Sequence, residues 1–139
     1  MRRQVLLDTG PLVALIDRRD RYHPWATSEV ATIQMPLLTC EAVISETYFL
    51  LQRANYGQEA LVGLLKQKLI QVPFHFDVEG DAIGDLLNRY RSIPMSVADA
   101  CLFRMAELYV GSLVLTIDHD FQIYRISKNQ ITPVIMPLD

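Results

Sequence analysis

Four acidic residues stand where the sequence should otherwise continue as buried strand or helix. Asp8 directly follows one apolar, strand-like run, and Asp118 follows another. Glu46 and Asp99 lie inside helix-like segments that are rich in Val, Ala, Leu and Phe. Carboxylates that converge without a Lys or Arg beside them repel one another, and a divalent metal ion is the usual remedy. We therefore expect these four acids to form one cation site.

The oxygen-only donor set indicates which ion the site would hold. Mg²⁺ and Mn²⁺ prefer carboxylate oxygens, whereas zinc sites usually include His or Cys. His23, His75 and His119 share no ligand spacing, so we expect them at the surface or in packing. A hard divalent ion beside a phosphate can lower the pKa of a bound water and stabilise the leaving oxygen. The chemistry that fits is hydrolysis of a phosphodiester.

Two of these acids also fit roles in local structure. Ser96 and Asp99 match a capping box, in which the Ser96 hydroxyl accepts from the N–H of residue 99 and the Asp99 carboxylate accepts from the N–H of Ser96. Asp8 fits a turn at Thr9 and Gly10, where it would accept from nearby backbone N–H groups. Both alternatives stay open at the level of sequence.

The remaining acids have structural alternatives of their own. Glu46 could form a buried ion pair with Arg104 or Arg53. Asp118 and its neighbour Asp120 could be turn or helix-cap residues. Each alternative is acceptable singly, but all of them would have to hold at once. A shared cation site explains the set with one cause, and we favour it.

The elements that must position the acids alternate between short β-like runs and longer helix-like runs. Strands are expected at residues 5–8, 36–39, 69–72, 112–117 and, as an edge strand, 131–136. Helices are expected from Pro11, from about Pro24, over 40–53 and 59–68, after Asp77, and from Ser96 to about Tyr109, with a short helical turn over 118–124. Strands separated by helices imply parallel pairing, and ligands of such sheets bind outside the carboxyl ends of the strands. Asp8 and Asp118 fall there.

Helical spacing also predicts how two acids face the core. Glu46 is one turn from Ala42 and from Leu50, so we expect it on the same stripe as core residues. Asp99 is in the first turn of its helix, beside the rim of the sheet. Gly111 is expected to end that helix in a left-handed conformation.

Length and composition predict one domain spanning residues 1–139. With 50% hydrophobic residues, a chain of 139 residues can bury one ordinary core. Its longest apolar stretches are far shorter than a membrane span, and its first residues show no signal-peptide pattern, so we expect a cytoplasmic protein that does not enter a membrane. Cys40 and Cys101 lack metal-type spacing and have apolar neighbours, which favours two reduced, buried thiols.

The net charge of −3 argues weakly against nucleic-acid binding. Five of the 16 acids are the four candidates and Asp120, however, and setting them aside leaves 11 acids against 13 Lys and Arg. The rest of the chain is therefore mildly basic. The arginine clusters at 18–21 and 89–91 are most simply solvated edges, although both could meet phosphates.

Four short motifs contain the candidate acids. They are Leu6-Leu7-Asp8-Thr9, Val43-Ile44-Ser45-Glu46, Ala98-Asp99-Ala100 and Thr116-Ile117-Asp118-His119-Asp120-Phe121. Each is weak alone, but their order and spacing are fairly specific, and together they cover essentially the whole chain. On these motifs the chain resembles PIN-domain proteins, and among them the VapC-type ribonuclease toxins of prokaryotes. Gly10 departs from a common form of the family pattern, in which Ser often follows Asp-Thr.

The resemblance implies a fold, a site and an activity. The fold would be a PIN-like three-layer α/β arrangement with a central, mostly parallel sheet of four or five strands flanked by helices. Mg²⁺ or Mn²⁺ would be coordinated mainly by Asp8, Asp99 and Asp118. Glu46 would coordinate through water or orient the attacking water. The site would also include Asp120 as a weaker fifth acid and Thr116 as a polar neighbour. The activity would be endonucleolytic hydrolysis of RNA.

The same resemblance implies partners. The RNA would be single-stranded or a tRNA loop, with Arg18, Arg19 or Arg91 on its phosphates. The protein would form a homodimer. If it is a toxin, a cognate antitoxin would lay an acidic or amphipathic segment over the active site and nearby arginines.

Parts of the sequence also fit three other functions. The segment Leu6-Leu7-Asp8-Thr9-Gly10 also resembles the active-site loop of a small dimeric aspartic protease, but such proteases are nearly all β, whereas 41–53 and 97–109 are strongly helical. A haloacid-dehalogenase-like phosphatase requires a second Asp where this chain has Gly10. The more serious alternative is a PIN-like fold kept as an RNA- or partner-binding module without efficient cleavage. The complete acid set argues against it.

Overall fold

Five short parallel strands form the centre of the structure, a computed structural model that describes residues 4–126 and 130–138. In spatial order they are β3 (Ile70–Gln71), β2 (Leu37–Leu38), β1 (Val5–Leu7), β4 (Leu113–Leu115) and β7 (Val134–Ile135). All four pairings are parallel. The three residues of β1 are all buried, as expected for a central strand covered on both faces.

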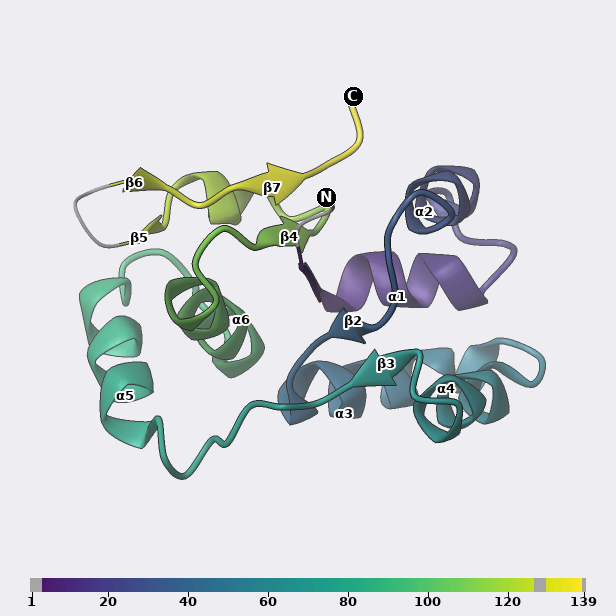
Figure 1. The fold of residues 1–139 in the computed structure, drawn as a ribbon, viewed down its shortest axis with the longest axis horizontal. Helices are drawn as coiled ribbons and strands as arrows, with labels where there is room; N and C mark the ends of the chain where they lie inside the picture. The colour runs from purple at the N-terminus through teal and green to yellow at the C-terminus, as the bar shows by residue number, and fades with distance from the viewer. Residues whose placement is uncertain (1–3, 127–129, 139) are drawn as a thin grey trace.

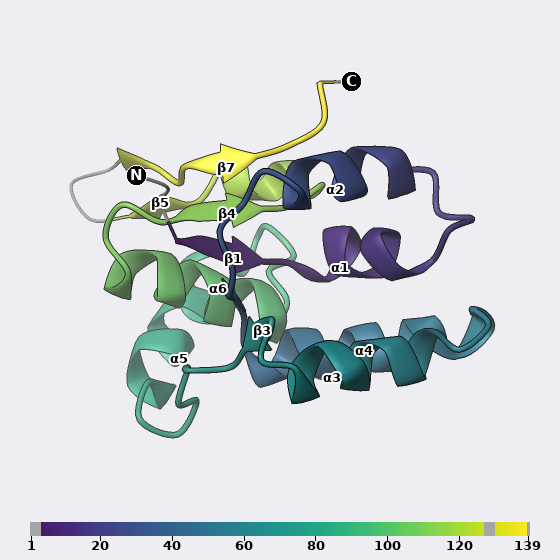
Figure 2. The same ribbon diagram turned by 45° about the vertical axis from the view of Figure 1, so that its right-hand side comes forward.

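Helices cover both faces of this sheet. α5 (Gly80–Arg89) and α6 (Val97–Leu108) lie on one side of the row of strands, and α1 (Thr9–Ile16), α2 (His23–Val30) and α4 (Gly57–Lys66) lie on the other (Figure 1). α3 (Glu41–Leu50), extended by the 3₁₀ turn η1 (Leu51–Arg53), runs beside α4 and contacts α1 and α6 (Figure 2). The predicted three-layer α/β fold is confirmed, and its helices exclude a nearly all-β aspartic protease.

Several element boundaries differ from the prediction. α1 begins at Thr9 with Asp8 as its N-cap, so Pro11 is the third helical residue; it is tolerated there because N–H groups in the first turn have no intrahelical acceptor. Glu79, not Asp77, precedes α5. The sequence also did not predict the small antiparallel pair of β5 (Arg125–Ile126) and β6 (Gln130–Ile131).

The buried face of α3 is not the predicted one. Val43 and Thr47 are buried, whereas Glu46 is exposed. Residues 43, 47 and 51 stand one turn apart and form the stripe that packs inward. The stripe of 42, 46 and 50 lies about 100° around the helix, so the expectation that Glu46 shares a stripe with core residues is wrong.

Two other expectations, about the end of α6 and about the state of the two cysteines, are confirmed. Gly111 follows α6 with a φ of 86°, the left-handed conformation expected there. Cys40 and Cys101 are free, buried thiols. Within residues 4–126 and 130–138, no helix is long and apolar enough to cross a membrane.

Candidate active site

Asp8 and Thr116 emerge side by side because β1 and β4 are adjacent, with Leu7 opposite Leu115. The backbone N–H of Asp8 donates to the carbonyl of Leu115 at 3.1 Å. The Thr116 hydroxyl donates to Oδ2 of Asp8 at 2.7 Å, and the N–H of Thr9 donates to Oδ1 at 2.8 Å. Both carboxylate oxygens of this buried acid are therefore held by neutral donors.

Asp118 is connected to Asp8 through the same hydroxyl. Its backbone N–H donates to Oγ1 of Thr116 at 2.9 Å. Its Oδ1 accepts from the N–H of Asp120 at 2.9 Å, which caps the 3₁₀ turn η2 (His119–Gln122). The structural alternative for Asp118 is thus present in the molecule. The cap does not remove the residue from the site, since its charge raises the pKa of Asp8.

Glu46 joins the cluster from α3. The Thr9 hydroxyl donates to Oε1 of Glu46 at 2.6 Å, across the contact between α1 and α3. The alternative pairing of Glu46 with Arg104 is wrong, because Arg104 bonds to Glu79 at 2.7 Å and to Glu107 at 3.2 Å. No ion pair between described residues joins Glu46 to Arg53.

Asp99 enters from the first turn of α6, where the predicted capping box is present. Oγ of Ser96 accepts from the N–H of Asp99 at 3.0 Å, and Oδ2 of Asp99 accepts from the N–H of Ser96 at 3.3 Å. The carboxylate is nevertheless close enough to Asp8 and Asp118 for their charges to raise its pKa. Asp99 therefore both caps a helix and faces the other acids.

Burial and the repulsion of neighbouring acids make ionisation of Asp8 and Asp99 unfavourable. The pKa of Asp8 rises to about 6, first because of burial and further because of the charges on Asp118 and Glu46, against the lowering effect of hydrogen bonds from Thr116 and Thr9. The pKa of Asp99 rises to about 7, again first through burial and next through the charge of Asp8. No ion pair between described residues supplies these acids with a positive partner.

The cluster fits a hard divalent cation by its chemistry, but its carboxylates are not converged for one. Among the residues that the structure describes, no three His, Cys, Asp or Glu side chains are grouped closely enough to hold a metal ion. Hydroxyl and backbone donors occupy several of the carboxylate oxygens instead. The donor set is nevertheless all oxygen and uncompensated in charge, so a cation would turn the repulsion into attraction.

Two of the three arginines expected to meet phosphate, Arg18 and Arg19, lie away from the acids. α1 begins beside Asp8, whereas Arg18 and Arg19 follow its opposite end, about 12 Å along the helix axis. Arg19 donates to the backbone carbonyl of Arg53 at 3.2 Å. Arg91 is exposed just after α5. Their contact with RNA stays a prediction.

Tyr124 is a residue near the acids that the sequence analysis missed. It is fully buried, and its hydroxyl has no hydrogen-bond partner within the described structure. Burial raises its pKa, and so do the nearby charges of Asp99, Asp120 and Asp118. The available signal was the pair of aromatic residues Phe121 and Tyr124, spaced one helical turn apart after the last acidic motif.

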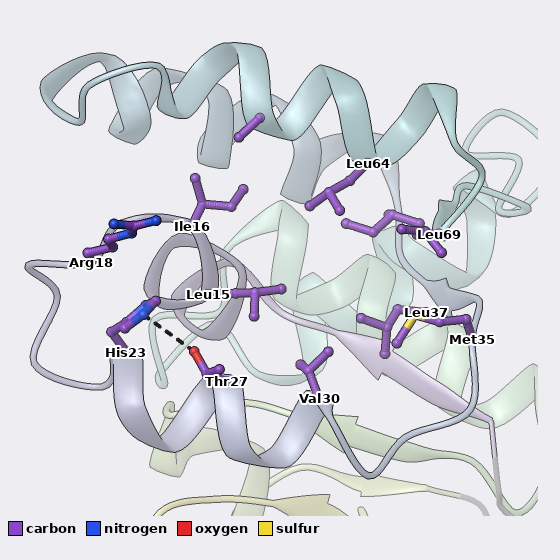
Figure 3. Close-up of a pocket in the computed structure, with 12 residues that line it drawn as sticks. Leu15, Ile16, Arg18, His23, Thr27, Val30, Met35, Leu37, Leu64 and Leu69 are labelled. Carbon is purple, nitrogen blue, oxygen red and sulfur yellow. Dashed lines mark hydrogen bonds between the residues drawn. The ribbon is translucent and has the colours of Figure 1, made fainter.

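A largely apolar groove of about 630 Å³ lies between α1, α2 and α4 (Figure 3). Leu15, Val30 and Leu64 are among its apolar walls. At one end it is lined by Arg18 and His23, and His23 makes a 2.7 Å hydrogen bond through Nδ1 to the carbonyl of residue 14. The acidic residues do not line this groove.

Comparison with known proteins gives a family and a fold. The PIN domain model matches residues 5–127. Among solved structures, Mycobacterium tuberculosis VapC20, a toxin that cleaves the sarcin-ricin loop, is 23% identical in sequence, with a TM-score of 0.77 over 86% of this chain and 94% of that one. At this identity the likeness concerns the fold. No curated protein matches the sequence significantly.

Proposed function

This chain belongs to the PIN domain family, and we propose that it is a Mg²⁺- or Mn²⁺-dependent endoribonuclease. The observation that carries the proposal is the acid cluster at the ends of β1 and β4. Two of its members, Asp8 and Asp99, have pKa values raised to about 6 and about 7, and no ion pair within the described residues neutralises them. Uncompensated carboxylates of this kind attract a divalent cation and, through it, a phosphate.

We assign the cation to Asp8, Asp99 and Asp118, with Asp120 as a weaker contributor. When bound, the ion would lower the pKa of a coordinated water and stabilise negative charge on the phosphate. Glu46 is exposed and has one oxygen held by the Thr9 hydroxyl, which leaves the other to orient the attacking water. A nearby carboxylate can accept a proton from that water.

Thr116 serves as the support of the cluster. Its buried hydroxyl donates to Asp8 and accepts from the backbone of Asp118, so it fixes two acids relative to each other. Because the donor is neutral, it orients Asp8 without cancelling its charge. The carboxylates keep their attraction for a cation.

We assign RNA as the substrate by family resemblance and by the basic balance of the rest of the chain. Arg18, Arg19 and Arg91 are exposed and available to phosphates. The VapC20 toxin cleaves the sarcin-ricin loop, and for this chain we propose a single-stranded segment or loop, including tRNA loops. We also propose that the protein acts in the cytoplasm.

We also propose that the protein is the toxin of a toxin–antitoxin pair. An amphipathic segment of the antitoxin would find a surface for its apolar side chains in the groove between α1, α2 and α4 (Figure 3). Acidic residues of that segment would face Arg18, at the end of the groove nearest the loop after α1. The segment would then continue along α1 towards the acids.

Self-association is proposed through α3 and α4. Tyr48 and Val62 line one shallow depression on these helices, and they are 46% and 38% exposed. Phe49 and Tyr56, at 65% and 79% exposed, belong to the same two helices and their connection. Light scattering should return about twice the 15.9 kDa of one chain, and a monomer at micromolar concentrations would contradict the dimer.

Cleavage of a labelled single-stranded RNA in Mn²⁺ tests the nuclease. Asp8→Asn and Asp118→Asn should each abolish cleavage, and chelation should abolish it in the wild-type protein. Asp85→Asn, which changes an exposed acid on α5, is the matched control and should cleave normally. Cleavage that persists in both variants, or in excess chelator, would contradict the proposal.

A second candidate is a PIN-like module that binds RNA or a partner without efficient cleavage. The observation in its favour is that the carboxylates of the described residues are not grouped as a ready metal site. The two functions differ in one measurement. RNA binding without Mn²⁺-dependent products, at enzyme concentrations well above the substrate, would favour the module.

A further inference from the structure

The ring of Tyr124 is locked in an aromatic cluster beside the acids. Its centroid lies 5.0 Å from that of Tyr90, 5.3 Å from Phe121 and 5.9 Å from Phe103. Phe103 is one helical turn after Asp99 on α6, so both side chains lie on the same face of that helix. A ring packed against Phe103 is thereby held next to the turn that carries Asp99.

The hydroxyl of Tyr124 is left without a partner in this position. It is fully buried and makes no hydrogen bond of normal length and angle among the described residues. Asp99 is the acid placed next to it by the packing, because Tyr124 contacts Phe103, which shares a face of α6 with Asp99. The charge of Asp99 accordingly contributes to the raised pKa of Tyr124. The two groups are thus near each other but not yet in hydrogen-bond geometry.

The buried Tyr124 hydroxyl lacks a hydrogen-bond partner within the described part of the chain, and ligand binding could supply one. A buried polar group without a partner is costly, and active-site hydrogen bonds are often long in the ligand-free state and shorten when ligand binds. Asp99 already accepts from the backbone of Ser96 at Oδ2 over a long 3.3 Å. A second donor would fix the rotation of its carboxylate, which one long bond does not.

Resting on the proposed function, we propose that Tyr124 is a positioning residue: its buried hydroxyl donates a hydrogen bond to ionised Asp99 and turns the carboxylate towards the divalent cation. Tyr124 does not touch the cation. It would act as the neutral partner of a metal ligand, in the way that hydrogen bonds behind a ligand usually orient it and raise affinity. A tyrosine hydroxyl, whose ordinary pKa is about 10, is protonated at neutral pH, so the donor is available.

Calorimetric titration with Mn²⁺ alone tests this in Tyr124→Phe, which removes the hydroxyl and keeps the ring. We expect the Mn²⁺ affinity to fall about 10–100-fold, with the metal-free melting temperature unchanged or raised because an unpaired buried group is gone. Tyr90→Phe is the matched control: its hydroxyl belongs to the same aromatic cluster but accepts from the N–H of Arg125 at 2.9 Å. It should lower the melting temperature and leave Mn²⁺ affinity intact.

A double-mutant comparison shows whether Tyr124 acts through Asp99. In an Asp99→Asn background, Tyr124→Phe should cause no further loss of Mn²⁺ affinity. Equal Mn²⁺ affinity in Tyr124→Phe and wild type would overturn the positioning role while leaving the metal site intact. A wild-type protein that binds no Mn²⁺ would overturn the proposed function and this inference with it, so the two failures are distinct.

Discussion

The sharpest prediction concerns Asp99→Asn in the metal-free protein, because this residue has two competing roles. Asn keeps an oxygen that can accept from the N–H of Ser96, so the capping box can survive the change. It removes the negative charge that faces Asp8 and Asp118. We expect the variant to be more stable than the wild type above pH 4, increasingly so up to about pH 7, and to have lost RNA cleavage.

The expected size follows from the pKa of Asp99, which is about 7 in the folded protein against an ordinary 3.8. An acid with a raised pKa in the folded state contributes stability that is complete below the unfolded pKa and is lost as pH rises through the folded pKa. At about 1.36 kcal/mol per pKa unit, the loss approaches roughly 4 kcal/mol by pH 8. Part of it is shared with Asp8, so we expect the Asn variant to gain on the order of 2–4 kcal/mol.

Urea unfolding in chelator at pH 4, 5.5, 7 and 8 measures this gain. Asp85→Asn, an exposed acid on α5, should show no comparable rise with pH. Ser96→Ala removes the cap acceptor and should lose about 0.5–2 kcal/mol at every pH. An Asp99→Asn variant that behaves like Ser96→Ala and still cleaves RNA would refute the reasoning, because Asp99 would then be a cap and nothing more.

Three further predictions concern the packing around the site. Thr116→Val removes a buried hydroxyl with two hydrogen bonds and should cost about 1–3 kcal/mol in urea unfolding at pH 7; an unchanged midpoint would contradict its supporting role. Gly10→Ala would place a Cβ 2.6 Å from Cγ1 of Ile117 and should destabilise by about 1–3 kcal/mol, whereas in an Ile117→Ala background the same change should be neutral or stabilising. Cys40 and Cys101, each 1% exposed, should react with dithionitrobenzoate only as the protein unfolds, and fast labelling of the native protein would show that the thiols are accessible.

The sequence predicted the sheet and the placement of two acids because both depend on local patterns. Apolar runs that end in an acid mark the carboxyl ends of strands, and parallel pairing brings such ends to one edge. Asp8 and Asp118 are indeed linked there through a single hydroxyl. The capping box at Ser96 was also readable, since its two partners are three residues apart.

The orientation of Glu46 could not be predicted from the sequence, because it depends on which side of α3 the rest of the fold covers. Helical spacing gives two candidate stripes, and only the tertiary contacts with α1 and α6 select the one containing Val43 and Thr47. Gly10 is a similar case. Its neighbour in space is Ile117, 107 positions further along the chain, and no local pattern connects them.

Side-chain hydrogen bonds between residues on different elements could not be predicted from the sequence either. The hydroxyls of Thr9 and Thr116 reach acids on other elements. Tyr124 comes near Asp99 only because the chain after η2 contacts α6, where the Tyr124 ring packs on Phe103. Single Thr and Tyr residues carry little pattern of their own. Their roles become visible when the distances are known.

The hydroxyl donors share one property that bears on how the site works. A Lys or Arg beside Asp8 would favour ionisation but would also satisfy the carboxylate charge, and a cation would then compete with a permanent partner. Thr9 and Thr116 orient the acids and leave their charge uncompensated. The cost appears as raised pKa values and lower stability of the metal-free protein at neutral pH. A site of this kind should bind its cation in competition with protons, so Mn²⁺ affinity should increase from pH 5.5 to 8.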